Sequence, residues 1–307
     1  MTKIHYPPIK WEENGKVTLP KIEFYINNTC NLTCNGCNRF NNFNFTGVQK
    51  WQDYEEVYSR WAQRINIHQL VIMGGEPLLN PTIVNWISGL NKLWGENIQI
   101  LSNGTRLNKV KGLYEACLYG KNWIGVSIHN PLQIESIVQQ ARNFLHGDDF
   151  YETGNIESLV RTPGYYKIED KNGVRVEFWS QTEFGQAAVH KDEKTGRFTL
   201  RQSDPIQTHQ GCSFFQHKSY HMIQGKLYKC GPVALFPEFD QQHNLDLSKE
   251  DKKLIYSYKP LSIDEFNDTA KYFLDHIDEP LSHCKFCPEG WRHTPELIYP
   301  TIKNKLN

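Results

Sequence analysis

The sequence predicts an α/β fold with a parallel sheet, and three observations support this prediction. Four strand-like runs alternate with four helical stretches between residues 21 and 145. Each run is short and apolar, and each ends at a polar or glycine-containing turn. With 307 residues, 39% of them hydrophobic, the chain is long enough for a barrel or a doubly wound domain with a smaller appendage. Alternation by itself leaves an open sheet and a barrel both possible.

The individual elements follow from apolar spacing and from residues that start or stop them. Trp51, Tyr58 and Trp61 recur at helical spacing, and Asn80 followed by Pro81 is typical of a helix start. We therefore expect strands at 21–26, 68–73, 97–101 and 123–128, and helices at 46–64, 80–94, 107–119 and 132–145.

Two hairpins are expected after residue 145, where the regular alternation ends. Asn172-Gly173 predicts a turn within 165–179, and Gln224-Gly225 predicts one within 219–230. The polar, irregular stretch 182–208 is typical of a linker between two domains.

The last hundred residues differ in character and predict a second, small α+β domain. Residues 262–277 predict an amphipathic helix that begins at a capping box of Ser262 and Glu265. We therefore divide the chain into an N-terminal extension at 1–20, a main domain at 21–205 and a small domain at 206–307.

Charge and hydropathy limit the partners and the compartment. The 34 basic and 34 acidic residues cancel, so charge gives no support for a nucleic-acid polymer as partner. No apolar run approaches the roughly 18 residues of a membrane span, and the N-terminus lacks an apolar signal-peptide core. We predict a cytoplasmic protein without a membrane partner, in which cysteines stay reduced and clusters of them bind metals.

Three cysteines, Cys30, Cys34 and Cys37, follow the first predicted strand within eight residues. Three thiols cannot pair off among themselves, but three thiolates on one loop can hold three corners of a 4Fe-4S cluster and leave one iron open. The alternatives are a zinc site, which usually takes four N or S ligands, and three incidental buried cysteines.

This chain resembles the radical SAM superfamily through two motifs in the expected order. Cys30-x3-Cys34-x2-Cys37 after the first strand matches the cluster motif of the family, and Gly74-Gly75-Glu76-Pro77 at the end of the second strand matches its GGEP motif. The resemblance covers roughly residues 20 to 180. It implies a partial (β/α)6 TIM-like barrel, with the chemistry at the carboxyl ends of the strands.

The resemblance also implies roles for individual residues. The three cysteines are expected to ligate a 4Fe-4S cluster whose open iron binds S-adenosyl-L-methionine (SAM). Gly74, Gly75, Glu76 and Pro77 are expected to bind the methionine part of SAM, with Glu76 at its ammonium group. Further cofactor-binding candidates are Ser127, Asn103, His129 and Phe40, the last in place of an aromatic residue that the family usually carries where this chain has Gly36.

Four further cysteines lie in the last hundred residues, at Cys212, Cys230, Cys284 and Cys287. Their spacing resembles the twitch domain, a shortened relative of the SPASM domain that holds an auxiliary 4Fe-4S cluster. Four cysteines saturate such a cluster, so its expected role is to take or relay electrons. A structural zinc site is the alternative. The remaining Cys117, in a helical stretch, is expected to be a small buried residue.

The resemblance implies an oxidoreductase that cleaves SAM to a 5′-deoxyadenosyl radical, which removes hydrogen from a substrate. The expected partners are a small-molecule or peptide substrate and an external one-electron reductant such as flavodoxin or ferredoxin. Glu177 and Arg175 are the candidate catalytic residues, and Trp179 and Gln181 are further substrate-side candidates on the same late strand.

Several functions stay open at this point. Oxidation of a small alcohol or aminocyclitol leads, and modification of a peptide or a nucleoside is the alternative. A zinc or iron–sulfur scaffold or electron carrier is the non-enzymatic alternative, although a carrier has no need of a methionine-binding loop.

Overall fold

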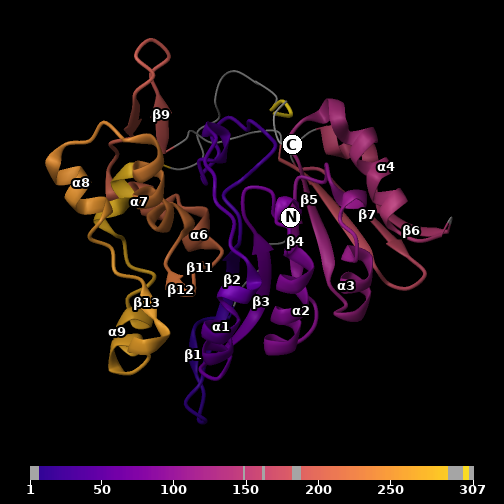
Figure 1. The fold of residues 1–307 in the computed structure, drawn as a ribbon, viewed down its shortest axis with the longest axis horizontal. Helices are drawn as coiled ribbons and strands as arrows, with labels where there is room; N and C mark the ends of the chain where they lie inside the picture. Colours follow the sequence, from indigo (N-terminus) through magenta and orange to yellow (C-terminus); the bar gives the residue numbers. More distant parts are fainter. Residues whose placement is uncertain (1–6, 148, 161–162, 182–187, 290–299, 304–307) are drawn as a thin grey trace.

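The computed structural model describes residues 7–147, 149–160, 163–181, 188–289 and 300–303 (Figure 1). Its main feature in these ranges is one sheet of eleven strands, in the order β13-β12-β11-β2-β3-β4-β5-β8-β7-β6, with β1 paired to β2. The strands are β1 (Lys10–Trp11), β2 (Val17–Tyr25), β3 (Ile65–Met73), β4 (Gln99–Ser102), β5 (Trp123–Ile128), β6 (Phe150–Gly154), β7 (Tyr165–Asp170), β8 (Arg175–Ser180), β11 (Ser219–Ile223), β12 (Lys226–Tyr228) and β13 (Leu261–Ser262). A separate hairpin joins β9 (Val189–Lys191) and β10 (Phe198–Leu200).

The helices fall into two groups. The first follows the parallel strands and comprises α1 (Glu55–Ala62), α2 (Ile83–Trp94), α3 (Leu113–Tyr119) and α4 (Ile134–Phe144). The second comprises α5 (Pro205–Gln210), α6 (Ser213–Gln216), α7 (Gly231–His243), α8 (Lys249–Ile255) and α9 (Asp268–Asp275). In Figure 1 the labels α6, α7 and α8 lie at the left, beyond β11, whereas α3 and α4 lie at the right.

The centre of the sheet is parallel. β2, β3, β4, β5 and β8 pair in parallel one after another, and β11 adds a further parallel strand on the other side of β2. The expected α/β class with a parallel-dominated sheet is therefore confirmed, and it is consistent with the expected partial barrel. Since the carboxyl ends of parallel strands share one edge, the loops that follow β2, β3, β4 and β5 meet there.

The two faces of the parallel strands differ in polarity because side chains alternate along a strand. Phe24 on β2 points to the helices, where its ring lies 5.2 Å from that of Tyr58 and 5.5 Å from that of Trp94. Lys21 and Glu23 alternate with Ile22 and Phe24 along β2 and therefore point to the opposite face. In register with Lys21 lies Gln69 of β3, so this face carries polar side chains under the edge where the loops meet.

Several predicted elements are confirmed, with bounds that shift by a few residues. Gly173, with a φ of 81°, turns the chain between β7 and β8, and Gln224-Gly225, both with positive φ, turns it between β11 and β12. The strand predicted at 123–128 has the bounds of β5. The strand predicted from residue 21 begins earlier, at Val17, so the boundary at residue 20 cuts through β2.

Three predicted helices begin at least six residues later than expected, each for a local reason. Residues 46–50 run extended because Asn28 N–H donates to Gly47 O (2.8 Å) and Gln49 N–H donates to Ile26 O (3.0 Å). The helix predicted at 107–119 is interrupted at Gly112, whose φ is 80°. The capping box at Ser262 does not form: its hydroxyl accepts from Asp264 N–H, and α9 starts later, with the Asn267 side chain as cap.

The region 182–208, predicted to be irregular, contains regular structure in its described part. Residues 188–208 include the hairpin β9–β10 and the start of α5, which begins at the capping residue Asp204. The remainder of this prediction, 182–187, lies outside the described residues.

The two predicted domains share a core as well as a sheet. Phe40, from the loop after β2, stacks on Phe236 of α7 at 5.3 Å, and Phe236 also packs against Phe286 at 5.6 Å. Tyr25 and Met73 at the ends of β2 and β3 belong to the same buried cluster. The C-terminal part therefore packs directly on the edge where the cysteine loop lies. None of the helices in the described part of the chain has the length and apolar character that a bilayer span needs.

Candidate functional site

The loop with Cys30, Cys34 and Cys37 forms a small buried cluster of its own with Leu32 at the carboxyl end of β2. Cys30 is 9% exposed and Cys34 is 8% exposed. Burial, and to a smaller extent the charge of the neighbouring thiols, raises the pKa of Cys34 well above its usual range. Burial also raises the pKa of Cys30 to about 12. Two buried thiols and the half-buried thiol of Cys37, this close together, favour a bound metal group, because coordination compensates for the burial of thiolate charge.

The donor set fits a cluster with an open iron, since the loop supplies three sulfurs. In the described ranges, no three His, Cys, Asp or Glu side chains converge tightly enough to hold a single metal ion.

The two glycines of Gly74-Gly75-Glu76-Pro77 allow the end of β3 to pack against the backbone that leads into the cysteine loop. Gly75 N–H donates to Asn27 O at 2.6 Å, and Glu76 N–H donates to Thr29 O at 2.9 Å. A Cβ added at Gly74 would lie 2.5 Å from Asn27 O, and one at Gly75 would lie 2.5 Å from Thr29 O. The glycines therefore let the backbone at the end of β3 come close to the backbone of the cysteine loop.

Glu76 is fully buried, and its side chain joins the loop after β3 to the end of β4. Its Oε1 accepts from Leu78 N–H at 3.0 Å and from the Ser102 hydroxyl at 2.8 Å. Its Oε2 accepts from Asn103 N–H at 2.8 Å. Burial outweighs these bonds and raises the pKa of Glu76 to about 6. The carboxylate fixes the turn after β4 against the end of β3, and its expected contact with a ligand ammonium stays a prediction.

Asn103 lies beside the cysteine loop. Its Nδ2 donates to Asn31 Oδ1 at 2.9 Å and lies 4.0 Å from Cys30 Sγ, while its Oδ1 accepts from the Thr105 hydroxyl at 2.7 Å. The structure thus brings Asn103, the Gly74–Pro77 segment and Cys30 together at one edge of the sheet. Asn103 and Glu76 were both expected in this region from the sequence.

Ser127 and His129 lie at the carboxyl end of β5. Ser127 is half-buried and in register with Trp179 of β8. His129 Nδ1 lies 3.3 Å from Gln181 O, and burial lowers the pKa of His129 to about 4, so its imidazole is neutral at pH 7. Their contact with SAM stays a prediction.

Arg175 and Glu177 share a face of β8, as the alternation of the strand predicts. Arg175 Nε lies 3.0 Å from Glu177 Oε1, and the guanidinium lies 5.1 Å from the Trp123 ring centroid. Both side chains are partly exposed. They form an ion pair on the same strand as Trp179, and their role in the reaction stays a prediction.

Phe40 is placed differently from what the sequence suggested. Its side chain has no exposed surface, and its ring lies 5.3 Å from the rings of both Phe236 and Phe239. The ring is part of the core between the cysteine loop and α7, so the interpretation as an adenine contact is corrected: this position packs two parts of the chain together.

The four C-terminal cysteines line one cavity of about 130 Å³. They come from separate elements: Cys212 precedes α6, Cys230 precedes α7, and Cys284 and Cys287 lie at a 3-10 helix (Ser282–Phe286). Burial raises the pKa of Cys230 to about 12 and that of Cys287 well above its usual range. Cys117, by contrast, lies fully buried in α3, as predicted for an incidental cysteine.

Three cationic residues near the cysteines were not anticipated. Lys229 is buried beside the four-cysteine cavity, with its Nζ donating to Glu279 O and lying 3.3 Å from His209 Nε2. Arg39 follows Cys37 by two residues and is also buried. Lys229 directly precedes Cys230 and Arg39 lies two residues after Cys37, and these positions in the sequence could have indicated cations near the cysteine sites.

Lys303, the third cation, approaches the first cysteine loop from the far end of the chain. Ile302 forms a bridge with Leu32, Lys303 N–H donates to Asn31 O at 2.8 Å, and Lys303 Nζ donates to Asn41 O at 2.6 Å. No local pattern in the sequence indicates this contact.

Comparison with known proteins agrees with the two motifs, the cysteine loop at Cys30–Cys37 and the Gly74–Pro77 segment. The family model described as Radical SAM superfamily matches residues 24–151. A GTP 3′,8-cyclase of Aquifex aeolicus (strain VF5) is 29% identical over 132 residues, which are 41% of this chain and 40% of that protein. A probable GTP 3′,8-cyclase of Methanothermobacter marburgensis is 26% identical over 95 residues, 31% of each chain. The chain therefore spans less than half the length of the curated relatives it matches.

Solved structures with some likeness include "Native anSMEcpe with bound AdoMet and Cp18Cys peptide", at 16% identity and a TM-score of 0.31 over 41% of this chain and 39% of that one. "Native anSMEcpe with bound AdoMet" has 15% identity and a TM-score of 0.32, over 40% of each chain. The family match, in contrast, contains Cys30, Cys34, Cys37 and the Gly74–Pro77 segment in their expected places. Residues 24–151 of this chain therefore match the radical SAM superfamily.

Proposed function

We propose that this radical SAM enzyme is an oxidoreductase that removes hydrogen from a small alcohol or aminocyclitol-type substrate, with an auxiliary 4Fe-4S cluster of the twitch type as electron acceptor or relay. The observation that carries the proposal is the single cavity lined by Cys212, Cys230, Cys284 and Cys287. Four thiols use all four irons of a cubane, so the ligand count favours electron transfer over substrate binding at this cluster.

The cavity also borders the first cysteine loop. Gly36 and Asn38, the two neighbours of Cys37, are among its lining residues. A short path between two metal groups is what an electron relay requires, and this shared wall supports such a path.

The first site would hold a 4Fe-4S cluster, and that cluster would supply the electron for cleavage of SAM to the radical that removes a hydrogen atom from the substrate. The chain's own residues prepare this site. Cys30, Cys34 and Cys37 supply the sulfurs, and Glu76 and Asn103 hold the surrounding loops in one arrangement through buried hydrogen bonds. Ser127 and His129 lie at the neighbouring strand end, where we propose that they contact SAM.

For an alcohol, the overall oxidation removes one hydrogen atom, one proton and one electron. The hydrogen atom leaves from carbon, and we propose that the Glu177 carboxylate accepts the hydroxyl proton. The ion pair with Arg175, at 3.0 Å, holds this carboxylate in place. The four cysteines would hold the group that takes the remaining electron, and an external one-electron acceptor would then receive it. The same kind of carrier, such as flavodoxin or ferredoxin, supplies the electron for SAM cleavage.

A second candidate is cyclisation of a nucleoside triphosphate. It is favoured by the names of the two curated relatives, which are GTP 3′,8-cyclases. A peptide substrate is the further alternative, without a specific feature of the described residues in its favour. The ligand count at the C-terminal cavity is the reason to place oxidation first.

Iron content and SAM cleavage test the proposal together. Protein purified and reconstituted without oxygen is expected to hold about eight irons, and Cys284→Ala/Cys287→Ala about four. With dithionite, both proteins are expected to form 5′-deoxyadenosine, but only the first is expected to oxidise an alcohol substrate. Conversion of GTP to a cyclic product by the unaltered protein would instead establish the second candidate.

A further inference from the structure

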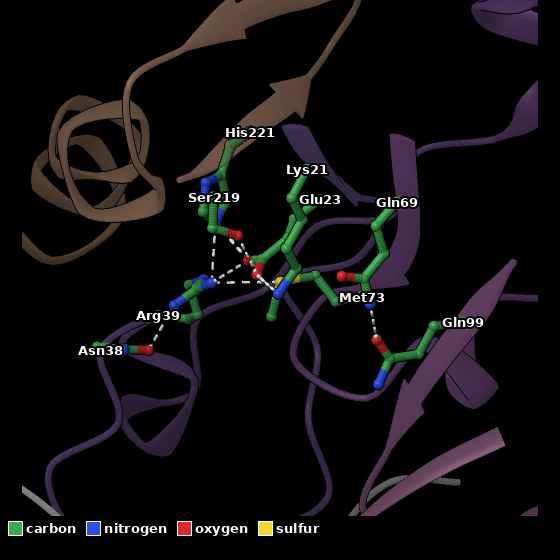
Figure 2. A network of polar contacts seen from close by, with 9 residues as sticks. All are labelled: Lys21, Glu23, Asn38, Arg39, Gln69, Met73, Gln99, Ser219 and His221. Atoms are coloured by element: carbon green, nitrogen blue, oxygen red, sulfur yellow. Dashed lines mark hydrogen bonds and ion pairs between the residues drawn. The ribbon is translucent and has the colours of Figure 1, made fainter. Parts of the chain in front are cut away.

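A buried ion-pair network joins β2, the first cysteine loop and β11 (Figure 2). Its members are Glu23 on β2, Arg39 in the first cysteine loop and His221 on β11, with exposed fractions of 6%, 5% and 0%. Arg39 Nη2 donates to Glu23 Oε2 at 2.9 Å and lies 2.8 Å from His221 Nε2. The network therefore ties the first loop to the strand that begins the C-terminal part of the sheet.

The Glu23 carboxylate is saturated with partners. Besides the bond from Arg39, it accepts a hydrogen bond from the Ser219 hydroxyl at 2.6 Å. Lys21 Nζ lies 3.1 Å and His221 Nε2 lies 2.9 Å from its oxygens. Figure 2 shows these side chains converging on it from β2 and β11. A charge this deeply buried is stable only with such compensation, which fixes the position of each cation around it.

Arg39 also touches the sequence neighbours of two C-terminal cysteines. Its guanidinium carbon lies 4.7 Å from the ring centroid of Phe214, two residues after Cys212. A Cβ added at Gly231, the residue after Cys230, would lie 2.8 Å from Arg39 Nε. Only a glycine at this position lets the first turn of α7 come so close to the guanidinium.

The network carries an excess of positive charge. Lys21 and Arg39 contribute two cations against the single carboxylate of Glu23, and burial lowers the pKa of His221, which favours its neutral form. Arg39 Nε and His221 Nδ1 are buried without a hydrogen-bond partner in the described part of the chain. Part of the charge on Arg39 is therefore not matched by this network.

We propose that Arg39 is a positioning residue that holds the four-cysteine cavity against the first cysteine loop and raises the reduction potential of the cluster in that cavity. This inference rests on the proposed function, because it requires the second cluster. A 4Fe-4S cluster with four thiolates carries net negative charge, which grows on reduction, and a nearby cation stabilises the reduced form. A higher potential makes the cluster a better acceptor of the substrate's electron.

The test compares the reduction potentials of variants by EPR-monitored redox titration of the complete protein. The signal of interest is the one that SAM does not alter, since only the first cluster has an open iron. Arg39→Gln is expected to disfavour reduction of this cluster about tenfold, which is about 59 mV to more negative potential for one electron. Arg39→Lys keeps the charge and is expected to recover most of the shift.

Lys21→Gln is the matched control. It removes one cation from the same carboxylate, but Arg39 is the cation that lies against Phe214 and Gly231, beside Cys212 and Cys230, so a smaller shift is expected from Lys21→Gln. Gly231→Ala keeps every charge and displaces the guanidinium, and it is expected to shift the potential in the same direction as Arg39→Gln. It provides the measurement if Arg39→Gln does not fold.

The outcomes separate this inference from the proposed function. If Arg39→Gln holds about eight irons and its second cluster has the same potential as in the unaltered protein, the role of Arg39 is overturned and the proposed function stands. Where Arg39→Gln does not fold, the same result in Gly231→Ala has the same meaning. An unaltered chain that binds only about four irons overturns the second cluster, and the role of Arg39 with it.

Discussion

The two cysteine sites of this protein are built in opposite ways. Cys30, Cys34 and Cys37 lie within one loop, directly after β2, so the chain brings them together locally. Cys212, Cys230, Cys284 and Cys287 come from three separate stretches and meet only because α6, α7 and the following segments pack into one body. The first site depends on the conformation of a loop, whereas the second depends on the fold.

This difference explains why the first site was recognisable as a motif and the second only as a spacing. It also predicts how each site responds to damage. Loss of a ligand in the loop removes the centre of the chemistry, while loss of a ligand in the cavity leaves the first site able to act alone.

The largest effect is expected from Cys34→Ala. Removal of one of three sulfurs leaves too few ligands for the first cluster, so formation of 5′-deoxyadenosine should fall to background. The measurement is chromatographic detection of 5′-deoxyadenosine after addition of dithionite and SAM. Cys117→Ala, in the buried incidental cysteine of α3, is the matched control and should retain cleavage. Cleavage that survives in Cys34→Ala would contradict the assignment of the loop.

A smaller effect on SAM binding is expected from Gly75→Ala. This variant tests whether the cysteine loop also depends on packing against the end of β3. The added methyl would lie 2.5 Å from Thr29 O, so the end of β3 must move away from the loop. Overpacking of this kind costs about 1–3 kcal/mol, and here it should also lower SAM affinity. Equilibrium binding of SAM to reconstituted protein checks this. Binding as tight as in the unaltered protein would show that the approach of the two backbones is dispensable.

The pH dependence of stability is expected to contain a contribution from Glu76. Its folded pKa is about 6, above the value of 4.5 for an ordinary glutamate, so the protonated form is favoured by folding. This contribution amounts to about 2 kcal/mol. It is complete below pH 4.5 and is lost as pH rises through about 6.

Glu76→Gln removes this titration. The free energy of unfolding of both proteins is measured with urea at pH 5 and pH 7. Relative to the unaltered protein, the variant should be more stable at pH 7 than it is at pH 5. An equal difference at both values would contradict burial as the dominant influence on Glu76.

The smallest effect is expected far from both cysteine sites, in the turn between β7 and β8. Gly173 has a φ of 81°, and no atom lies within 4 Å of an added Cβ, so Gly173→Ala introduces backbone strain without a clash. We expect a loss of about 1 kcal/mol of stability. Thermal unfolding measures it, and iron content should stay unchanged. A drop in iron content would show that this hairpin is coupled to the cysteine sites.

Sequence patterns predicted the parts of the molecule that are determined locally. The β7–β8 turn follows from Asn172-Gly173, and the parallel pairing of β2, β3, β4 and β5 follows from alternation of strands and helices. The position of Glu76 and Asn103 at the same edge follows from their places after consecutive parallel strands.

Long-range contacts account for what the sequence did not reveal. Phe40 faces α7 because residues nearly two hundred positions away supply its neighbours, Phe236 and Phe239. The parallel pairing of β11 with β2 and the approach of Lys303 to the first loop have the same origin. No local periodicity encodes such partners, so spacing alone could not place them.

The most direct test of the account is whether the second cysteine site holds an iron–sulfur cluster independently of the first. A triple variant, Cys30→Ala/Cys34→Ala/Cys37→Ala, removes the local site and leaves the cavity. After anaerobic reconstitution, metal analysis and EPR of the reduced protein should show about four irons and the signal of a reduced cluster. A colourless triple variant that binds zinc instead of iron would contradict the account and make the C-terminal cavity a structural metal site.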